Sequence, residues 1–216
     1  MKKRLYAIGI TLLMMCKLLL FVGCANKAES TLFDDFVRID KNGEKIYVTE
    51  KEIKEDLAEE QFVQYLSEDE KMRITLAITP CDELLPDTRF GGNYHVEAWF
   101  EWLEVPKNRG TDNISLEMDN TSWLCIDTVS ILRYQTKNGK IFEKSVSSNF
   151  KTAEWDLPSG SLTALQIYKE IYVTMTYPSL SQYTSCFAEY THNNSISRDA
   201  RYNLYHRIEY TPVAQE

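Results

Sequence analysis

The sequence of 216 residues has few of the residues and none of the patterns that most catalytic and metal sites use. It has three histidines and five cysteines, and no Cys-x-x-Cys pair occurs. The His-Glu-x-x-His and Gly-x-Ser-x-Gly patterns of hydrolases are absent, as are the glycine-rich phosphate loop and Ser-x-x-Lys with its companion motifs. We therefore predict neither a metal site nor a cofactor, and the sequence alone does not identify an activity.

Basic residues are also in deficit, with 24 Lys and Arg against 32 Asp and Glu and a formal net charge of −8. Nucleic-acid binding needs a surplus of basic residues, so nucleic acid is not an expected partner. Four of the basic residues lie in residues 1–23, which leaves 20 basic and 32 acidic residues in the remainder, a net charge of −12. An anionic membrane or wall polymer repels such a body, which favours neutral glycans, cations or basic proteins as ligands.

The N-terminal segment carries the strongest signal. Residues 1–4 read Met-Lys-Lys-Arg, residues 5–22 are almost all apolar apart from Lys17, and Gly23 precedes Cys24. A basic start, an apolar run and a small residue at the cleavage point are typical of a secretory signal peptide. The cysteine directly after the small residue resembles the lipobox of bacterial lipoproteins, in which this thiol becomes lipidated.

The lipobox resemblance implies that residues 1–23 are removed and that Cys24 carries the lipid. Residues 24–35 are then a tether, and the protein is held at the extracytoplasmic face of the cell membrane, where two or three acyl chains anchor stably. One alternative is an uncleaved membrane anchor, because the apolar run is about long enough to span a bilayer. Lys17 inside the run would make that anchor costly. A plain secreted protein is a further alternative.

Residues 36–79 are predicted to form a small hairpin and charged helical region. Asn42 and Gly43 lie between two β-prone runs, and Asn-Gly at such a place favours a tight hairpin of type I′. Thr49 with Glu52 three residues later forms a capping box, and apolar residues follow at helical spacing. This hairpin and helical region is therefore expected to precede the β-sandwich as a region of its own.

Two further signals lie before the main body. The segment Ser-Glu-Asp-Glu from Ser67 to Glu70 is a second capping box and predicts another short helix towards Leu76. Residues 80–93 contain two prolines and a Gly-Gly pair, which indicates a loop. We place the domain boundary there.

Residues 80–216 are predicted to form an antiparallel β-sandwich. Residues 94–102 alternate with a period of two, as a half-buried strand does, and Asn138-Gly139 favours another hairpin. The other strand candidates are 114–118, 123–136, 140–146, 164–177, 182–192 and 201–210. Strands at this spacing without intervening helices indicate a mainly β fold, either a sandwich or a barrel. We predict the sandwich.

One segment resembles known proteins more specifically. A W-x3-P-x2-R-x2-D pattern runs from Trp102 to Asp112, and an aromatic–small–His step follows at 190–192. Both are similar to a group of secreted Firmicutes proteins of unknown function, whose N-terminal region also resembles residues 36–76. The resemblance implies a secreted β-rich fold and no activity. Within the segment, we expect Arg109 to pair with Asp112 across the turn.

Three cysteines are left once Cys24 is assigned to the lipid. Cys81, Cys125 and Cys186 allow at most one disulfide, and the three possible pairings stay open. An immunoglobulin-like pair fails one check, because Thr184 stands where a tyrosine two residues before the second cysteine is expected. We expect at least two of the three thiols to be free and buried.

The candidate ligand-binding residues are aromatic. Trp99 falls on the polar side of its strand beside Glu97 and Glu101, while Tyr168 and Tyr172 alternate with aliphatic residues. Exposed aromatic rings on a β-sandwich stack against sugar rings, so these three side chains are predicted to contact a glycan. The alternative is that both faces of their strands are covered, by the second sheet on one side and by the helical arm or a loop on the other.

The sequence thus predicts a lipid-anchored surface protein that is more readily a binding module than an enzyme. Its ligand would be a neutral glycan, a wall component or a protein. One alternative is an envelope hydrolase that uses a pair of carboxylates whose separation decides the chemistry. Its candidate residues are Glu97, Glu101, Glu104 and Asp112. A purely structural or immunity-type surface lipoprotein is the other alternative.

Overall fold

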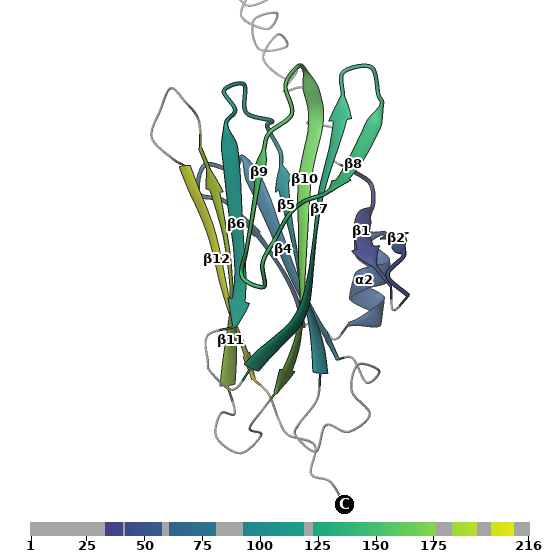
Figure 1. Ribbon diagram of the computed structural model, residues 1–216, viewed down its shortest axis with the longest axis vertical. Helices are drawn as coiled ribbons and strands as arrows, with labels where there is room; N and C mark the ends of the chain where they lie inside the picture. The colour runs from purple at the N-terminus through teal and green to yellow at the C-terminus, as the bar shows by residue number, and fades with distance from the viewer. Residues whose placement is uncertain are drawn as a thin grey trace, which may run out of the picture. The chain divides into compact units, whose positions relative to one another are not determined.

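The computed structural model describes residues 33–40, 42–57, 61–80, 93–118, 123–175, 183–193 and 200–209. These residues form one short helix and twelve strands, and the strands are arranged in three antiparallel sheets (Figure 1). The predicted signal peptide and most of the predicted tether lie outside the described residues. In the described part of the chain, no helix is both long enough and apolar enough to cross a bilayer.

The first described elements are a hairpin and a helix. Strands β1 (Phe36–Ile39) and β2 (Lys45–Val48) pair antiparallel, and helix α2 (Glu50–Asp56) follows. The predicted capping box is confirmed, since the Thr49 hydroxyl accepts from the Glu52 N–H and the Glu52 carboxylate accepts from the Thr49 N–H. The hairpin and helix therefore form where the local sequence predicts them. The predicted type I′ turn is wrong, because Gly43 has a φ of 79° but Asn42 has no positive φ.

A six-stranded sheet has the order β3-β4-β5-β10-β7-β8. Its strands are β3 (Phe62–Leu66), β4 (Met72–Pro80), β5 (Asn93–Trp102), β7 (Trp123–Thr136), β8 (Ile141–Ser145) and β10 (Leu162–Met175). The predicted helix from Ser67 towards Leu76 is wrong. The Ser67 hydroxyl instead accepts from the Lys71 and Met72 N–H groups in the turn between β3 and β4. The predicted domain boundary at residue 80 falls at the end of strand β4, which pairs with β5.

The second sheet of the sandwich has four strands in the order β12-β11-β6-β9. They are β6 (Thr111–Met118), β9 (Thr152–Asp156), β11 (Tyr183–His192) and β12 (Ala200–Glu209). Strand β9, which has five residues and lies at the edge of this sheet, was not among the strands predicted from the sequence. Its side chains nevertheless enter the core, because Ala153 and Trp155 are buried there.

The hairpin predicted at Asn138-Gly139 joins β7 to β8, as expected, but its turn differs from type I′. The Thr136 N–H donates to the Lys140 carbonyl, and the Gly139 N–H donates to the Thr136 carbonyl. Gly139 has a φ of 81°, whereas Asn138 has no positive φ. Three residues thus form the loop, with glycine in the left-handed position that other residues avoid.

The two larger sheets pack face to face, so the predicted β-sandwich is confirmed. Alternate residues of β5, from Val96 to Trp102, enter a core shared with Ile114 and Leu116 of β6 and with Ala188 of β11. The large apolar area removed from water in this core is the main source of stability of such a fold.

The outer face of the six-stranded sheet is covered as well. The hairpin and α2 place Phe36, Val37 and Ile53 against Trp99 and Tyr168 of this face. The Trp99 indole N–H donates to the Val37 carbonyl at 2.9 Å, and the Phe36 ring meets the Trp99 ring edge to face at 5.2 Å. The sheet is therefore buried on both sides where the hairpin and helix lie.

Candidate ligand-binding site

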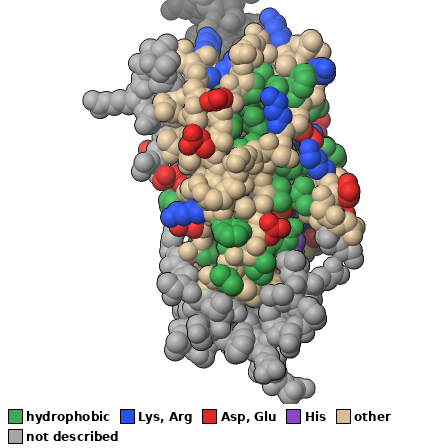
Figure 2. Space-filling view, in the orientation of Figure 1, with side chains coloured by type: hydrophobic (Ala, Val, Ile, Leu, Met, Phe, Trp, Pro, Cys, Tyr) green, Lys and Arg blue, Asp and Glu red, His purple; other side chains and the backbone are tan. Residues whose placement is uncertain are grey.

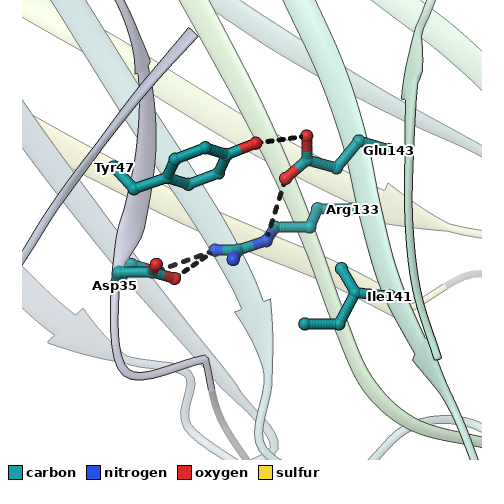
Figure 3. A pocket seen from close by; sticks show the side chains of 5 residues that line it. All are labelled: Asp35, Tyr47, Arg133, Ile141 and Glu143. Atoms are coloured by element: carbon teal, nitrogen blue, oxygen red, sulfur yellow. Dashed lines mark hydrogen bonds and ion pairs between the residues drawn. The ribbon is translucent and has the colours of Figure 1, made fainter. Parts of the chain in front are cut away.

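An open hollow of about 410 Å³ lies where the N-terminal hairpin meets the edge of the six-stranded sheet. Asp35, just before β1, and Tyr47 of β2 line it from the hairpin side. Arg133 of β7, with Ile141 and Glu143 of β8, lines it from the sheet (Figure 3). We call these five residues the Tyr47 hollow. Antiparallel pairing places Arg133 directly opposite Glu143, which is why both side chains reach the same face.

Arg133 is the charged centre of the Tyr47 hollow. Its Nη1 lies 2.6 Å from a carboxylate oxygen of Asp35 and donates to the Asp35 carbonyl at 3.0 Å. Its Nε lies 3.2 Å from the Glu143 carboxylate, in an ion pair without hydrogen-bond geometry. The rings of Phe33 and Tyr47 lie 4.1 and 5.2 Å from the guanidinium carbon. The cation is therefore held by two carboxylates and two aromatic rings.

Tyr47 is fixed at the rim by its hydroxyl. The hydroxyl donates to Glu143 Oε2 at 2.7 Å, and Lys45 Nζ lies 3.2 Å from the same oxygen. The hydrogen bond to Glu143, together with partial burial, raises the pKa of the Tyr47 phenol, so the phenol stays protonated at neutral pH. The ring is nonetheless 48% exposed, and Ile141 across the hollow is 46% exposed.

The Tyr47 hollow thus combines apolar walls with polar groups that still have bonding capacity. No hydrogen bond or ion pair found among the described residues uses Arg133 Nη2, and the Asp35 side chain is 36% exposed. The Asp35 carboxylate is therefore an accessible acceptor beside an exposed ring, whereas the Arg133 side chain is only 5% exposed. Such a combination suits reversible binding of a small polar ligand.

The predicted aromatic binding residues do not form an exposed surface. Trp99 and Tyr168 are fully buried under the hairpin, and Tyr172 is 8% exposed. The Tyr172 ring instead packs edge to face on the His95 ring, with 4.1 Å between centroids. The prediction that these three rings are exposed to a glycan is therefore wrong. The alternative, strands covered on both faces, is what the structure shows for Trp99 and Tyr168.

A buried polar network surrounds these rings. Arg38 of the hairpin donates twice to the Glu97 carboxylate, at 2.7 and 2.8 Å. The Tyr168 hydroxyl lies 3.1 Å from Glu97 and 2.8 Å from Glu170, whose other oxygen is 2.7 Å from His95 Nδ1. Burial raises the pKa of Glu97, and the charge of Arg38 opposes that rise. The network therefore ties the hairpin to the sheet.

The carboxylates considered for hydrolysis do not share a site. Glu101 is buried and bound by Arg73 at 2.8 Å and by Gln166 at 3.0 Å. Burial raises its pKa, and Arg73 opposes the rise. Glu97 and Glu101 lie on the outer face of the sheet beside Trp99, whereas Asp112 lies in the four-stranded sheet. None of these carboxylates lines the Tyr47 hollow.

The structure brings together the two segments on which the resemblance to secreted proteins rests. Asp112 is fully buried, accepts from the Tyr190 hydroxyl, and lies 2.9 Å from His192 Nδ1. The Trp102 indole N–H donates to the Tyr190 oxygen at 3.0 Å, which links the two sheets. The expected pairing of Arg109 with Asp112 is wrong, because Arg109 donates to the carbonyls of residues 158 and 160.

The cysteines yield no disulfide among the described residues. Cys125 is half-buried, Cys186 is buried, and neither cysteine forms a disulfide. Cys24 and Cys81 lie outside the described residues, so lipidation stays a prediction. Within the part of the chain that the structure describes, no three His, Cys, Asp or Glu side chains are grouped as metal ligands.

The charged side chains of both signs are interspersed over the face seen in Figure 2. Ion pairs also link charged side chains at the surface of the described residues, such as Lys54 with Glu50 at 2.6 Å and Lys151 with Glu117 at 2.6 Å. Exposed pairs of this kind contribute little to stability. This face therefore offers no field of a single sign for steering a charged partner.

No known protein-family model matches the sequence, and no characterised protein matches it significantly. Solved structures show weak likenesses. The collagen-binding subdomain of the Enterococcus faecalis surface protein ACE is 5% identical, with a TM-score of 0.37 over 53% of this chain and 87% of that one. The collagen-binding domain of a Staphylococcus aureus adhesin is 8% identical, with a TM-score of 0.35 over 62% and 96%.

The C-terminal domain of the Streptococcus agalactiae AgI/II polypeptide BspA is 10% identical, with a TM-score of 0.37 over 75% of this chain and 62% of that one. These values are too low to carry ligands or activities over to this chain. The functional argument therefore rests on its own residues.

Proposed function

We propose that the protein is a lipid-anchored, non-catalytic binding module at the extracytoplasmic face of the cell membrane. The Tyr47 hollow carries the binding part of this proposal, because it places an exposed ring beside the exposed Asp35 carboxylate at the edge of a sheet. Its groups are held in ion pairs and hydrogen bonds, and the Tyr47 hydroxyl that donates to the Glu143 carboxylate has a raised pKa, which disfavours its use as a nucleophile. Binding without chemistry is the function this arrangement supports best.

The anchor part of the proposal rests on the lipobox-like Gly23-Cys24. We expect Cys24→Ser to abolish incorporation of labelled palmitate and to move the protein out of the membrane fraction. Cys16→Ser is the matched control, since Cys16 lies in the apolar run of the leader and should leave both measurements unchanged. Unchanged fractionation of Cys24→Ser would refute lipid anchoring at this residue.

The binding part is tested by screening the full-length protein, in a zwitterionic detergent, against arrays of glycans and of extracellular proteins. The expected result is at least one ligand whose retention falls in Tyr47→Ala. If the wild-type protein retains no ligand of either class, the binding function is refuted and the structural alternative is favoured.

A further inference from the structure

Building on the binding function above, we propose that the Tyr47 hollow binds a neutral sugar, with the Tyr47 ring as its stacking surface. The glycan contact predicted at the buried Trp99 would then lie at Tyr47, at the rim of an open cavity. The charges, the exposed groups and the size of the hollow favour this class of ligand.

The charges of the hollow favour a neutral ligand. Asp35 and Glu143 each carry a negative charge, and Arg133 and Lys45 compensate them in contacts of 2.6 to 3.2 Å. A charged ligand would gain no net attraction from four groups whose formal charges sum to zero, yet it would lose hydration on entry. An anion would also be repelled by the excess of acidic residues in the body of the chain.

The exposed groups match a polyhydroxyl compound. A sugar presents C–H groups on the faces of its ring, which can pack on the exposed ring of Tyr47 and on Ile141. Its hydroxyls both donate and accept, so a sugar hydroxyl can donate to the Asp35 carboxylate, whose side chain is 36% exposed. The volume of about 410 Å³ lies at the small end of the range of known small-molecule sites.

The stacking ring is already oriented. The Tyr47 hydroxyl is held by Glu143, which is itself held by Arg133 (Figure 3). Lys45 also forms an ion pair with Glu143. A ligand therefore meets a ring whose orientation costs little further entropy to fix. The same contacts join the hairpin to β8, so sugar binding should also stabilise the docked hairpin.

The probe is a panel of neutral mono- and disaccharides of glucose, galactose, mannose and N-acetylglucosamine, with sialyllactose as the anionic comparison. Binding to the full-length protein is followed by saturation-transfer NMR and calorimetry in a zwitterionic detergent, because glycoside detergents would compete. We expect at least one neutral sugar to bind, with the strongest saturation on its ring C–H protons. Sialyllactose should bind no more tightly.

Three variants locate the site. Tyr47→Ala should weaken sugar binding by about tenfold, or roughly 1.4 kcal/mol, since it removes the stacking ring. Tyr47→Phe keeps the ring but loses the hydrogen bond to Glu143, so its loss should be smaller. Tyr65→Ala is the matched control, because Tyr65 is similarly exposed, at 44%, but lies on β3 at the opposite edge of the sheet. Thermal melting of each variant checks that it is folded.

The outcomes separate the ligand class from the binding function. If no neutral sugar binds, or if Tyr47→Ala binds as tightly as Tyr65→Ala, the sugar assignment is overturned. In that case a protein ligand retained on the array would leave the binding function intact. If the wild-type protein binds neither sugars nor proteins, both proposals fail together.

Discussion

Lys169 should make the stability of this protein rise with pH in the alkaline range. Its side chain lies within the sandwich core between Ile167 and Ile171 and is fully buried. The ammonium donates to the Thr128 hydroxyl at 2.8 Å and to the Asn149 carbonyl at 3.1 Å, and no ion pair among the described residues includes it. Burial lowers its pKa from 10.5 to about 8, and a smaller electrostatic interaction with Cys125 opposes this change.

The magnitude follows from the size of that change. A difference of about 2.5 pKa units between the unfolded and folded states corresponds to ~3 kcal/mol of unfolding free energy. The Lys169 side chain binds its proton more tightly in the unfolded chain than in the folded one, so below pH 8 the protein is destabilised by the full ~3 kcal/mol. This lost stability is recovered as the pH rises from about 8 to 10.5. Between pH 7 and 9.5 the expected gain from this group is about 2 kcal/mol.

The assay compares denaturant unfolding of the wild type with that of Lys169→Met at several pH values from 7 to 9.5. Methionine does not titrate, so the stability difference between the two proteins should change by about 2 kcal/mol across this range. Unpaired acceptors at Thr128 and Asn149 shift the absolute stability of the variant but leave this slope unchanged. Lys137→Met, at an exposed turn, is the matched control and should show no such slope.

The range stops at pH 9.5 because Tyr168 acts in the opposite direction at higher pH. Burial and the charge of Glu97 raise its pKa well above 10, so the folded phenol stays protonated where the unfolded phenol ionises. A difference between wild type and Lys169→Met that stays constant from pH 7 to 9.5 would show that Lys169 is not a buried cation.

Two further stability predictions follow from the buried polar groups. Arg38→Met leaves the Glu97 carboxylate buried without its cation and should lower the unfolding free energy by about 3–5 kcal/mol. A loss below 1 kcal/mol in denaturant unfolding would count against tight docking of the hairpin. Tyr190→Phe removes one hydroxyl from between Asp112 and Trp102 and should cost about 1–3 kcal/mol, measured as a lower Tm. An unchanged Tm would mean that this link between the sheets contributes nothing.

Local patterns predicted the elements whose formation depends on neighbouring residues. The Thr49 capping box, the two Asn-Gly hairpins and the alternation in β5 all involve residues within a few positions of each other. The box from Ser67 to Glu70 failed because the same hydroxyl that caps a helix can equally close a β-turn. There, pairing of β4 with two neighbouring strands outweighs local helix preference.

The exposure of the candidate binding residues depended on contacts between distant parts of the chain. Trp99 has polar neighbours in sequence, so alternation predicts that it faces solvent. It is buried because the hairpin, more than fifty residues earlier, covers that face and supplies Arg38 to neutralise Glu97. The Tyr47 hollow gave no sequence signal, since Tyr47 and Arg133 are far apart in the chain and meet only when the hairpin docks.

The sequence by itself thus determined the acidic charge and a mainly β body, because these depend on composition and short-range periodicity. It also predicts a signal peptide that ends before Cys24. Only the tertiary structure decided which residues are accessible. Burial is a property of both partners in a contact, and a strand does not encode what will pack on it. The same long-range packing that buried Trp99 and Tyr168 left Tyr47 exposed beside Arg133, which is why the candidate site moved.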